Sequence, residues 1–435
     1  MKTQGRSTTR RDFLKTAGTG LALGMTASNY RALAQGSPNE KIVMGFIGVG
    51  GMGTGRLNEF IRFDDVAAAA VCDVDEDHLN HALSEVEKRN HPKPKGFHDF
   101  RELLELKEID AVTVTTPDHW HALAFLKACQ AGKDVFVEKP LCYCIAEGRA
   151  MLEAARKNKR VTQLGTHIHN DTPNYRRVVE VVQSGALGII TRVQCWKTSG
   201  TRGIGKPADC DPPKSLDYNF WLGPAPKRPY NPNRSHFNFR YFWDYSGGNF
   251  IDFWCHITDV AFWALNLGAP ISVMATGGRF FVDDNTETPD SLDVLYEYPN
   301  LILAWTMHPR GISGYESFGG IGCVFEGTKA SLVTNYDRHE ILIGGKKADS
   351  FKTPEKSIPD SPGHVREFLN SIKSRKLTTC DVEYAFRLTK PGLLGNIAYR
   401  VGERIYWDDK KECVIHNTKA NRLVKRHYRS PWKLA

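Results

Sequence analysis

The chain has 435 residues, enough for two domains, and its 41% hydrophobic and 25% charged residues are near the globular average. This composition excludes general disorder and fibrous repeats, and no run of 18 apolar residues predicts a permanent membrane span. The formal net charge is +9. Residues 1–34 hold six Lys/Arg and one acid and so carry +5, which leaves +4 for the rest of the chain. Because the body between this segment and the basic tail 419–433 is nearly neutral, we expect no nucleic-acid groove.

Residues 1–34 have the pattern of an export signal. Arg10 and Arg11 are followed by Phe-Leu-Lys, then by a short apolar stretch over 17–27 and by a small-x-small cleavage sequence at 32–34. The apolar part is too short to span a bilayer. The paired arginines resemble the twin-arginine signal, with a chance Arg-Arg in a basic tail as the alternative. We therefore expect export by the twin-arginine machinery to the periplasm, after the protein has folded with its cofactor.

The ten cysteines form no Cys-x-x-Cys pair and no Cys/His cluster with zinc spacing, so we expect no metal site. Several lie in apolar runs, where cysteine packs as a small hydrophobic residue. Cys142 and Cys144 are too close in sequence for an easy bridge. Most of the cysteines are therefore expected to be free thiols.

Residues 41–165 are predicted to form a dinucleotide-binding domain. An apolar run over 41–47 leads into a Gly-x-Gly-x-x-Gly loop, and a helical stretch follows over 54–62. The first glycine permits the tight turn, the second lets a pyrophosphate approach the backbone, and the third lets helix and strand pack closely. The cofactor residues predicted in this loop are Gly48, Val49, Gly50, Gly51, Met52 and Gly53.

A second predicted strand, 66–72, ends at Asp73, which lies 20 residues after Gly53. A carboxylate at this distance bonds the adenosine ribose hydroxyls. An acid there repels a 2′-phosphate, so NAD is favoured over NADP. The glycine pattern alone could be a plain glycine-rich turn, but strand, helix and acid in register predict a cofactor site.

Strand and helix patterns alternate up to residue 165. Strands are predicted over 109–115, 134–137 and 161–165, with helices over 119–131 and 145–158. Such alternation predicts a doubly wound parallel sheet, the Rossmann arrangement, whose ligands bind at the carboxyl ends of the strands. The further cofactor residues predicted at these ends are Thr116, Pro117, His121, Glu138 and Lys139. A solvent-facing histidine at a helix start is an equally good interpretation of His121.

Three motifs together resemble the Gfo/Idh/MocA family, which includes glucose–fructose oxidoreductase, inositol dehydrogenase and rhizopine-catabolism proteins. They are Gly48-x-Gly50-x-x-Gly53, Thr116-Pro117-Asp118-His119-x-His121 and Glu138-Lys139-Pro140-Leu141. Segments 393–398 and 407–408 resemble the same family, so the resemblance covers the whole mature chain. It implies an NAD(P)-dependent oxidoreductase acting on a small carbohydrate, with a second sheet that supplies substrate contacts and the surface of a homo-oligomer.

The pattern changes over residues 166–380, the predicted substrate and oligomerisation domain. A loop rich in proline, asparagine and arginine over 201–235 precedes a predicted helix over 247–265. Period-two apolar runs with short turns follow, so we predict an α+β domain with a large, mostly antiparallel sheet. Residues 381–435 are predicted to be a helix and tail that, by the resemblance, brace the first domain. We expect the basic end of the tail to be solvated or to drape over a subunit.

Catalysis of sugar oxidation needs a base for the hydroxyl proton and a group that holds the hydroxyl against the cofactor. Asp252 and His256 lie four residues apart on the predicted helix, so the carboxylate could orient an imidazole that takes the proton. Lys139 at a strand end could hold the substrate oxygen. The resemblance implies the same three catalytic residues, whereas the alternatives are a helix-surface pair and a solvated lysine. Asp259 could be a second ligand contact, but we favour a plain acid on the helix surface.

Aromatic residues concentrate before and within the predicted helix that carries Asp252. Fifteen of the chain's 46 Phe, Trp and Tyr lie within 218–263. Sugar rings stack on aromatic faces, although core packing explains most residues of this kind. The predicted substrate-binding residues are His167, Arg240, Trp243 and Tyr245.

The sequence favours an exported NAD(P)-dependent oxidoreductase acting on a secondary hydroxyl of a sugar, glycoside or polyol. Because an exported enzyme cannot draw on the cytoplasmic NAD pool, we expect a tightly bound cofactor. One alternative is an NAD-dependent glycosidase that works by transient oxidation and elimination, although such glycosidases carry another residue where Lys139 stands. The other alternative is a non-catalytic nucleotide-binding sensor, against which the intact set of three catalytic residues argues.

Overall fold

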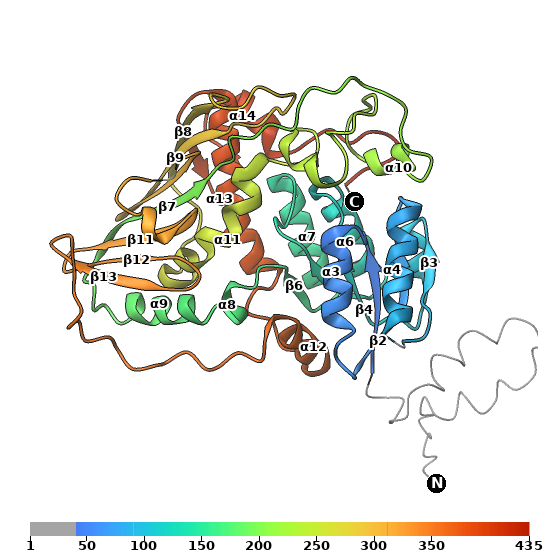
Figure 1. Cartoon of the computed structure of the whole chain (residues 1–435), viewed down its shortest axis with the longest axis horizontal. Coiled ribbons are helices and arrows are strands. Elements are labelled where there is room, and N and C mark those ends of the chain that lie inside the picture. The colour runs from blue at the N-terminus through green and yellow to red at the C-terminus, as the bar shows by residue number, and fades with distance from the viewer. Residues whose placement is uncertain (1–40, 90, 311, 435) are drawn as a thin grey trace, which may run out of the picture.

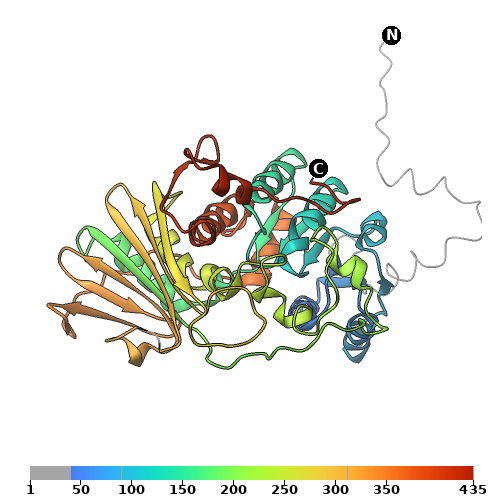
Figure 2. The same ribbon diagram turned by 90° about the horizontal axis from the view of Figure 1, so that it is seen from above.

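The computed structural model describes residues 41–434 except 90 and 311, so the predicted signal peptide lies outside the described residues. Two sheets organise the molecule, one of six strands and one of ten. Figures 1 and 2 show them side by side, with α13 (Val382–Val401) between them. Helix α13 contacts β8 (Ser272–Gly278) of the larger sheet and α7 (Ile145–Lys157) beside the smaller one. None of the helices within the described residues is long and apolar enough to cross a bilayer.

The six-stranded sheet is wholly parallel and has the order β3-β2-β1-β4-β5-β6. The four central strands, β1, β2, β4 and β5, are short, mostly apolar runs that are largely buried, as parallel strands covered by helices must be. They are β1 (Ile42–Ile47), β2 (Val66–Cys72), β3 (Lys95–Phe97), β4 (Ala111–Val114), β5 (Asp134–Val137) and β6 (Thr162–Leu164). The helices between them are α3 (Gly51–Phe60), α4 (Glu76–Lys88), α5 (Phe100–Glu105), α6 (Asp118–Gln130) and α7. The prediction of a doubly wound Rossmann sheet is confirmed.

The ten-stranded sheet is antiparallel at every pairing except that of β7 with β10, which is parallel. Burial alternates along β9, because one face of the sheet packs on helices and the other does not. The strands besides β8 are β7 (Ile190–Thr198), β9 (Ser291–Tyr298), β10 (Leu301–His308), β11 (Ile321–Gly327), β12 (Ser331–Thr334), β13 (His339–Ile343), β14 (Lys346–Lys347), β15 (Ile405–Asp408) and β16 (Cys413–Val414). The predicted large, mostly antiparallel sheet is confirmed.

Helices α9, α11 and α13 pack against strands of this sheet. The helices of this half besides α13 are α8 (Ile168–Asp171), α9 (Pro173–Gln183), α10 (Tyr218–Leu222), α11 (Gly248–Leu265), α12 (His364–Ser374) and α14 (Thr418–Val424), with 3-10 turns η1 (His236–Tyr241) and η2 (Glu316–Phe318). Helix α11 carries the predicted catalytic pair into the boundary between the two halves.

Asp259 on α11 is fully buried, so the expectation of a surface acid is wrong. Its carboxylate accepts hydrogen bonds from the Thr166 hydroxyl (3.1 Å) and the Tyr384 hydroxyl, and its Oδ1 lies 3.0 Å from the Nε2 atom of His169. These partners come from two segments far from Asp259 in the chain, residues 166–169 and helix α13. Asp259 therefore joins the core elements behind α11 and does not face solvent.

The basic tail is not free. Arg426 is buried beside Glu147 of α7, with 2.8 Å between its Nε and the carboxylate. Trp432 packs edge-on against Trp120 of α6 and also contacts the ring of Phe220. The expectation of a solvated or subunit-draping tail is wrong for these residues, because their side chains pack on the Rossmann half and on α10.

All ten cysteines lie within the described residues and are free thiols. Cys195 and Cys323 face each other across β7 and β11 with their Sγ atoms 3.4 Å apart, in a fully buried position. Both behave as small core residues there.

Candidate active site

A cleft of about 420 Å³ opens at the carboxyl ends of the Rossmann strands. One wall comes from the Rossmann half and contains all the predicted cofactor residues except Val49. These residues are Gly48, Gly50, Gly51, Met52, Gly53, Asp73, Thr116, Pro117, His121, Glu138 and Lys139. The opposite wall includes Arg240 and Asp252 from the second half of the chain. The cleft therefore lies between the two halves, where ligands of doubly wound sheets bind.

The glycine loop has the shape that a dinucleotide needs. Gly48 has φ +79°, and a Cβ atom there would lie 2.7 Å from the backbone nitrogen of Thr116. A Cβ atom on Gly53 would lie 1.9 Å from the Gly48 carbonyl oxygen. Only glycine at position 53 therefore lets α3 start this close to the end of β1. Gly51 has no atom within 4 Å of its Cβ position. The loop is thus tight on the protein side and open on the side where a pyrophosphate would approach.

Asp73 is fixed at the end of β2 by two backbone donors. Its carboxylate accepts the Val49 N–H at 2.7 Å and the Asp75 N–H at 3.0 Å. Val49 itself is fully buried and does not line the cleft. Its predicted role changes accordingly, because its N–H positions the acid that would hold the ribose.

His121 is buried, so the interpretation as a solvent-facing residue is wrong. Its Nδ1 lies 2.8 Å from the Pro140 carbonyl oxygen, and its Nε2 lies 2.8 Å from the Thr116 carbonyl oxygen. The ring therefore links the turn after β4 to the strand end that carries Lys139. The imidazole lines the cleft while it holds these two segments together.

Lys139 and Asp252 form an ion pair across the boundary between the halves. The Lys139 Nζ atom lies 2.5 Å from Asp252 Oδ1 and 3.1 Å from the Asp252 carbonyl oxygen. The second carboxylate oxygen lies 3.1 Å from the Arg240 Nε atom. Burial alone would lower the pKa of Lys139, but the charge of Asp252 outweighs it and the pKa is raised. Burial would likewise raise the pKa of Asp252, and the two cations lower it. Both groups are therefore charged.

His256 lies one helical turn after Asp252, beside His167. The two imidazole centroids are 5.8 Å apart, and the centroid of the Phe253 ring also lies 5.8 Å from that of His256. Burial, with the nearby Lys139 charge, lowers the pKa of His256 to about 3. The Nδ1 atom of His256 is buried without a hydrogen-bond partner. The ring is therefore neutral, and one of its nitrogens is free for a further hydrogen bond.

The structure does not show Asp252 orienting His256, as the sequence predicted. Both carboxylate oxygens of Asp252 engage Lys139 and Arg240, and the described contacts include no hydrogen bond to the imidazole. The two residues share one helix face, as four-residue spacing requires. Neither His256 nor His167 lines the cleft beside the glycine loop.

Three of the four predicted substrate residues, His167, Trp243 and Tyr245, do not line this cleft. Tyr245 is fully buried, with its ring centroid 4.9 Å from that of Trp221 and 5.2 Å from that of His119. Trp243 stacks on Tyr399 of α13, at a centroid distance of 6.2 Å. Tyr245 is a core residue, so its predicted substrate contact is wrong, whereas substrate contacts of Trp243 and His167 remain predictions. Arg240 lines the cleft and pairs with Asp252, and its contact with substrate also remains a prediction.

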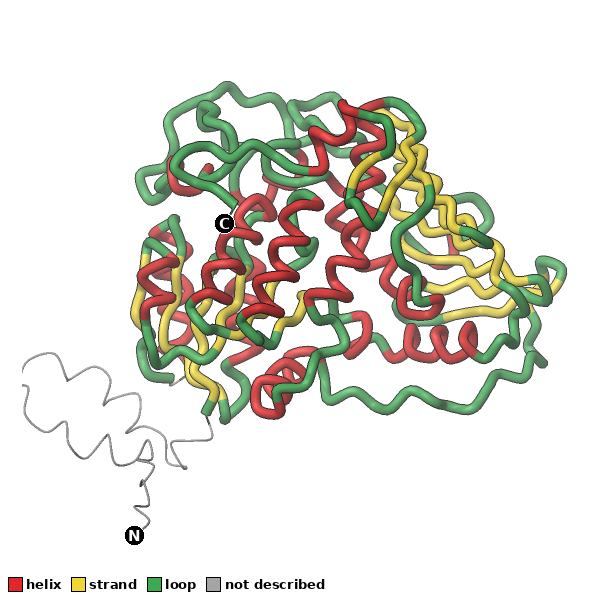
Figure 3. The backbone as a smooth tube through the Cα atoms, turned by 180° about the vertical axis from the view of Figure 1, so that it is seen from behind, coloured by secondary structure: helices red, strands yellow, loops and turns green. Residues whose placement is uncertain are grey.

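Sequence analysis missed the residues that form the second wall of the cleft. They belong to the segment 199–247, which we name the arm. The arm residues that line the cleft besides Arg240 are Phe220, Trp221, His236, Phe237 and Phe239. The high aromatic density of this stretch is the sequence signal that could have found them. We interpreted it as a sugar-binding surface, whereas these residues line the nucleotide cleft. Figures 1 and 3 show the arm crossing over one end of the Rossmann half, with α10 near α4.

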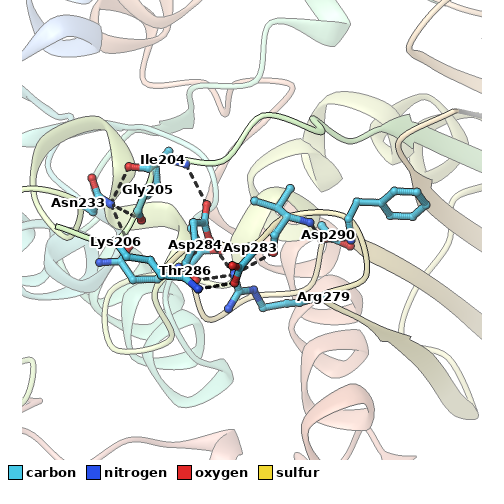
Figure 4. Close-up of polar contacts among 12 residues, drawn as sticks. Ile204, Gly205, Lys206, Asn233, Arg279, Asp283, Asp284, Thr286 and Asp290 are labelled. Atoms are coloured by element: carbon cyan, nitrogen blue, oxygen red, sulfur yellow. Dashed lines mark hydrogen bonds and ion pairs between the residues drawn. The ribbon is translucent and has the colours of Figure 1, made fainter.

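The arm is anchored at both of its faces. On the Rossmann side, Glu76 N–H donates to the Ser215 carbonyl at 2.9 Å and Asp217 N–H donates to the Val74 carbonyl at 3.0 Å. On the other side, Figure 4 shows a polar network in which Ile204 N–H donates to Asp284 at 3.0 Å. The network also includes Asn233, whose amide donates to the carbonyls of Ile204 and Gly205, and Arg279, which pairs with Asp284. These anchors hold the aromatic side chains over the cleft.

Two groups of side chains within the described residues have the chemistry of metal ligands. One comprises Asp75, His78 and His236, and the other is the fully buried group His169, Asp259 and Cys380. Their members come from segments far apart in the chain, so no spacing rule in the sequence could find them. The absence of a metal site remains a prediction.

Two family models match the chain. "Oxidoreductase family, NAD-binding Rossmann fold" matches residues 42–166, and "Oxidoreductase family, C-terminal alpha/beta domain" matches 173–296 and 343–434. The chain belongs to the Gfo/Idh/MocA oxidoreductase family. This membership makes the first half of the molecule an NAD-binding Rossmann domain and the protein an oxidoreductase-family enzyme.

Curated relatives of this Gfo/Idh/MocA protein include the "Glycosyl hydrolase family 109 protein" of Shewanella baltica (strain OS185), which is 29% identical over 205 residues. The match covers 41% of this chain and 43% of the relative, less than half of either. A protein of the same description from Shewanella pealeana is also 29% identical, over 203 residues.

Solved structures similar to this Gfo/Idh/MocA protein share its fold. The WlbA dehydrogenase from Bordetella pertussis, solved with NADH and UDP-GlcNAcA, has a TM-score of 0.61 at 16% identity, covering 85% of this chain and 99% of that one. A levoglucosan dehydrogenase solved with NADH and levoglucosan has a TM-score of 0.59 at 17% identity, covering 84% and 99%.

Proposed function

We propose that this protein is an NAD-dependent oxidoreductase that takes a hydride from a carbon bearing a secondary hydroxyl in a sugar, glycoside or polyol. The observation that carries the proposal is the Lys139–Asp252 ion pair, placed at the meeting point of the nucleotide cleft and the second half. The solved relatives hold NADH with UDP-GlcNAcA or levoglucosan, which supports a carbohydrate substrate.

Each of the three residues has a distinct proposed task. Bound NAD supplies the hydride acceptor. Lys139, kept charged by Asp252, donates a hydrogen bond to the substrate oxygen and holds it in place. His256, one helical turn after Asp252 on the same face of α11, is the proposed acceptor of the hydroxyl proton. In this proposal Asp252 positions Lys139, whereas the sequence analysis predicted that Asp252 orients His256.

We infer that the cofactor is held tightly, because the arm and the tail lie over the cleft. Phe220 lines the cleft and is backed by Trp432, whose ring centroid lies 5.6 Å away. The experiment is to denature freshly purified protein and measure the released nucleotide. About one NAD per chain is expected, and protein that carries none and binds added NAD only weakly would contradict the inference.

The main experiment is a panel of sugars, glycosides and polyols assayed with the purified protein. Nicotinamide absorbance and released product are followed together in each well. A net rise in NADH absorbance with one substrate class supports the oxidoreductase. No absorbance change and no product across the panel would count against catalysis and favour a nucleotide-binding sensor.

A second candidate function is an NAD-dependent glycosidase. The observation that favours it is the 29% identity to the glycosyl hydrolase family 109 proteins. Such an enzyme oxidises and re-reduces its substrate within one turnover, so its net reaction is hydrolysis. Release of a sugar from an aryl glycoside with no added NAD and no net absorbance change would identify this activity and displace the first proposal.

We also propose export and self-association. Arg10 and Arg11 support twin-arginine export to the periplasm, and an R10K/R11K double variant should remain in the cytoplasm on cell fractionation. Exposed apolar residues on strands of the larger sheet support a homo-oligomer, among them Met274, Leu295 and Ile302. Light scattering that gives the mass of one chain would exclude the oligomer.

A further inference from the structure

We propose that Asp75, His78 and His236 form a binding site for a divalent transition-metal ion of the zinc class at the mouth of the cofactor cleft. The two histidines line the cleft, and Asp75 is buried directly beside them. Imidazole nitrogen and carboxylate oxygen are ordinary zinc ligands, and three protein ligands leave one position open. This site is distinct from Lys139, Asp252 and His256, and it does not depend on the proposed reaction.

The distances suit a single ion. The Nε2 atom of His236 lies 3.3 Å from Asp75 Oδ2, and one ligand atom from each of the three residues lies within 4.8 Å of the other two. Two ligands about 2.1 Å from a tetrahedral ion are themselves about 3.4 Å apart. The Asp75–His236 pair is therefore already at ligand spacing, and His78, whose ring centroid is 4.7 Å from that of His236, needs only a small side-chain movement.

The donors are oriented as metal ligands usually are. The Oδ1 atom of Asp75 caps α4 by accepting the Asp77 N–H at 2.9 Å, which leaves Oδ2 for another partner. The Nδ1 atom of His78 lies 3.8 Å from the Asp73 carboxylate. A carboxylate beside a ligating imidazole fixes the ring and strengthens it as a ligand. Asp73, Asp75 and Asp77 together give this end of α4 a negative charge that favours a cation.

His236 is held in an uncommon backbone conformation. Its φ is +49°, in the left-handed region that residues other than glycine seldom adopt. The anchored arm maintains this conformation at the first residue of η1.

The ion would connect the two halves of the molecule. Asp75 and His78 belong to the start of α4 in the Rossmann half, whereas His236 belongs to the arm. A metal bound by all three therefore ties the arm to the Rossmann half beside Asp73. We expect its removal to loosen the arm.

The test is a titration of the full chain with Co²⁺ after treatment with EDTA, followed by visible absorption, and repeated with Zn²⁺ by calorimetry. One Co²⁺ per chain with the strong visible bands of a tetrahedral site is expected. His236→Asn and His78→Gln should each weaken binding at least tenfold, because each removes one ligand. Asparagine tolerates the left-handed backbone at 236, so this variant should fold, and its thermal melting checks that.

His81→Gln is the matched control, because His81 is an exposed histidine one turn further along α4. It should bind Co²⁺ as the unchanged protein does. The proposal is overturned if the unchanged protein binds no Co²⁺. It is equally overturned if folded His236→Asn binds with unchanged affinity, which would assign the ion to another group such as His169, Asp259 and Cys380.

Discussion

The two walls of the cleft are built by different means. On the Rossmann side, the glycine loop and Asp73 directly follow strands and Lys139 lies two residues after one, so local geometry places them. On the other side, the arm has only two short helical turns, and contacts with distant segments hold it, including the network of Figure 4. A strand end therefore positions the residues that follow it by itself, whereas an irregular segment takes its position from the segments on which it packs.

The largest expected effect concerns the point at which the two walls meet. Lys139→Met should lower kcat by about 10³-fold, because the substrate oxygen loses its charged donor. NAD binding should change little, since the glycine loop and Asp73 remain. Steady-state kinetics with the substrate found in the panel, together with a nucleotide titration, measure both effects.

Lys157→Met is the control for that substitution, because Lys157 is an exposed lysine at the end of α7. It should leave kcat unchanged. A loss of less than tenfold in Lys139→Met would remove the lysine from the proposed chemistry.

The rigidity of the Rossmann wall is tested by two glycines of α3. Gly53→Ala should lower the free energy of unfolding by about 3 kcal/mol, because its Cβ would meet the Gly48 carbonyl oxygen at 1.9 Å. Gly55→Ala, with no atom within 4 Å of its Cβ position, should raise the free energy of unfolding by about 0.7 kcal/mol. Urea denaturation compares the two, and equal effects would contradict the close packing.

His256 gives the second half a pH dependence. Its pKa is about 3 in the folded protein against 6.5 for the ordinary group, so the unfolded chain binds the extra proton between these values. Stability therefore falls as pH drops below about 6.5. At pH 5 this histidine alone costs about 2 kcal/mol. The drop in unfolding free energy from pH 7 to pH 5 should be about that much smaller in His256→Gln, and an unchanged drop would show that the ring is not buried in its neutral form.

The smallest expected effect concerns the arm. Phe220→Ala should weaken NAD binding about fivefold, which is about 1 kcal/mol, because one aromatic face of the cleft is lost. Phe280→Ala is the control, since Phe280 is 71% exposed and lies outside the cleft. Equal NAD affinity in the unchanged protein and in Phe220→Ala would show that this arm residue does not contribute to cofactor binding, which would then depend on the Rossmann wall.

Sequence analysis predicted nearly all the residues of the Rossmann wall, but only some of those in the wall formed by the arm and α11. The glycine loop and Asp73 follow from local pattern, and Asp252 and His256 were correctly placed on one helix face. The sequence predicted His256 as the partner of Asp252, but the partner is Lys139. The two residues of this pair lie more than 100 positions apart, and hydrophobic periodicity carries no information on contacts over such a separation. Tyr245 failed as a substrate residue because composition shows aromatic content but not which rings face inward.

Trp432 packs against Trp120 and Phe220, which both line the cleft, although its own side chain does not. The tail therefore supports the nucleotide site from behind, on the Rossmann side through Trp120 and on the arm side through Phe220. Proteolytic removal of the tail would loosen both walls without removing any residue that lines the cleft.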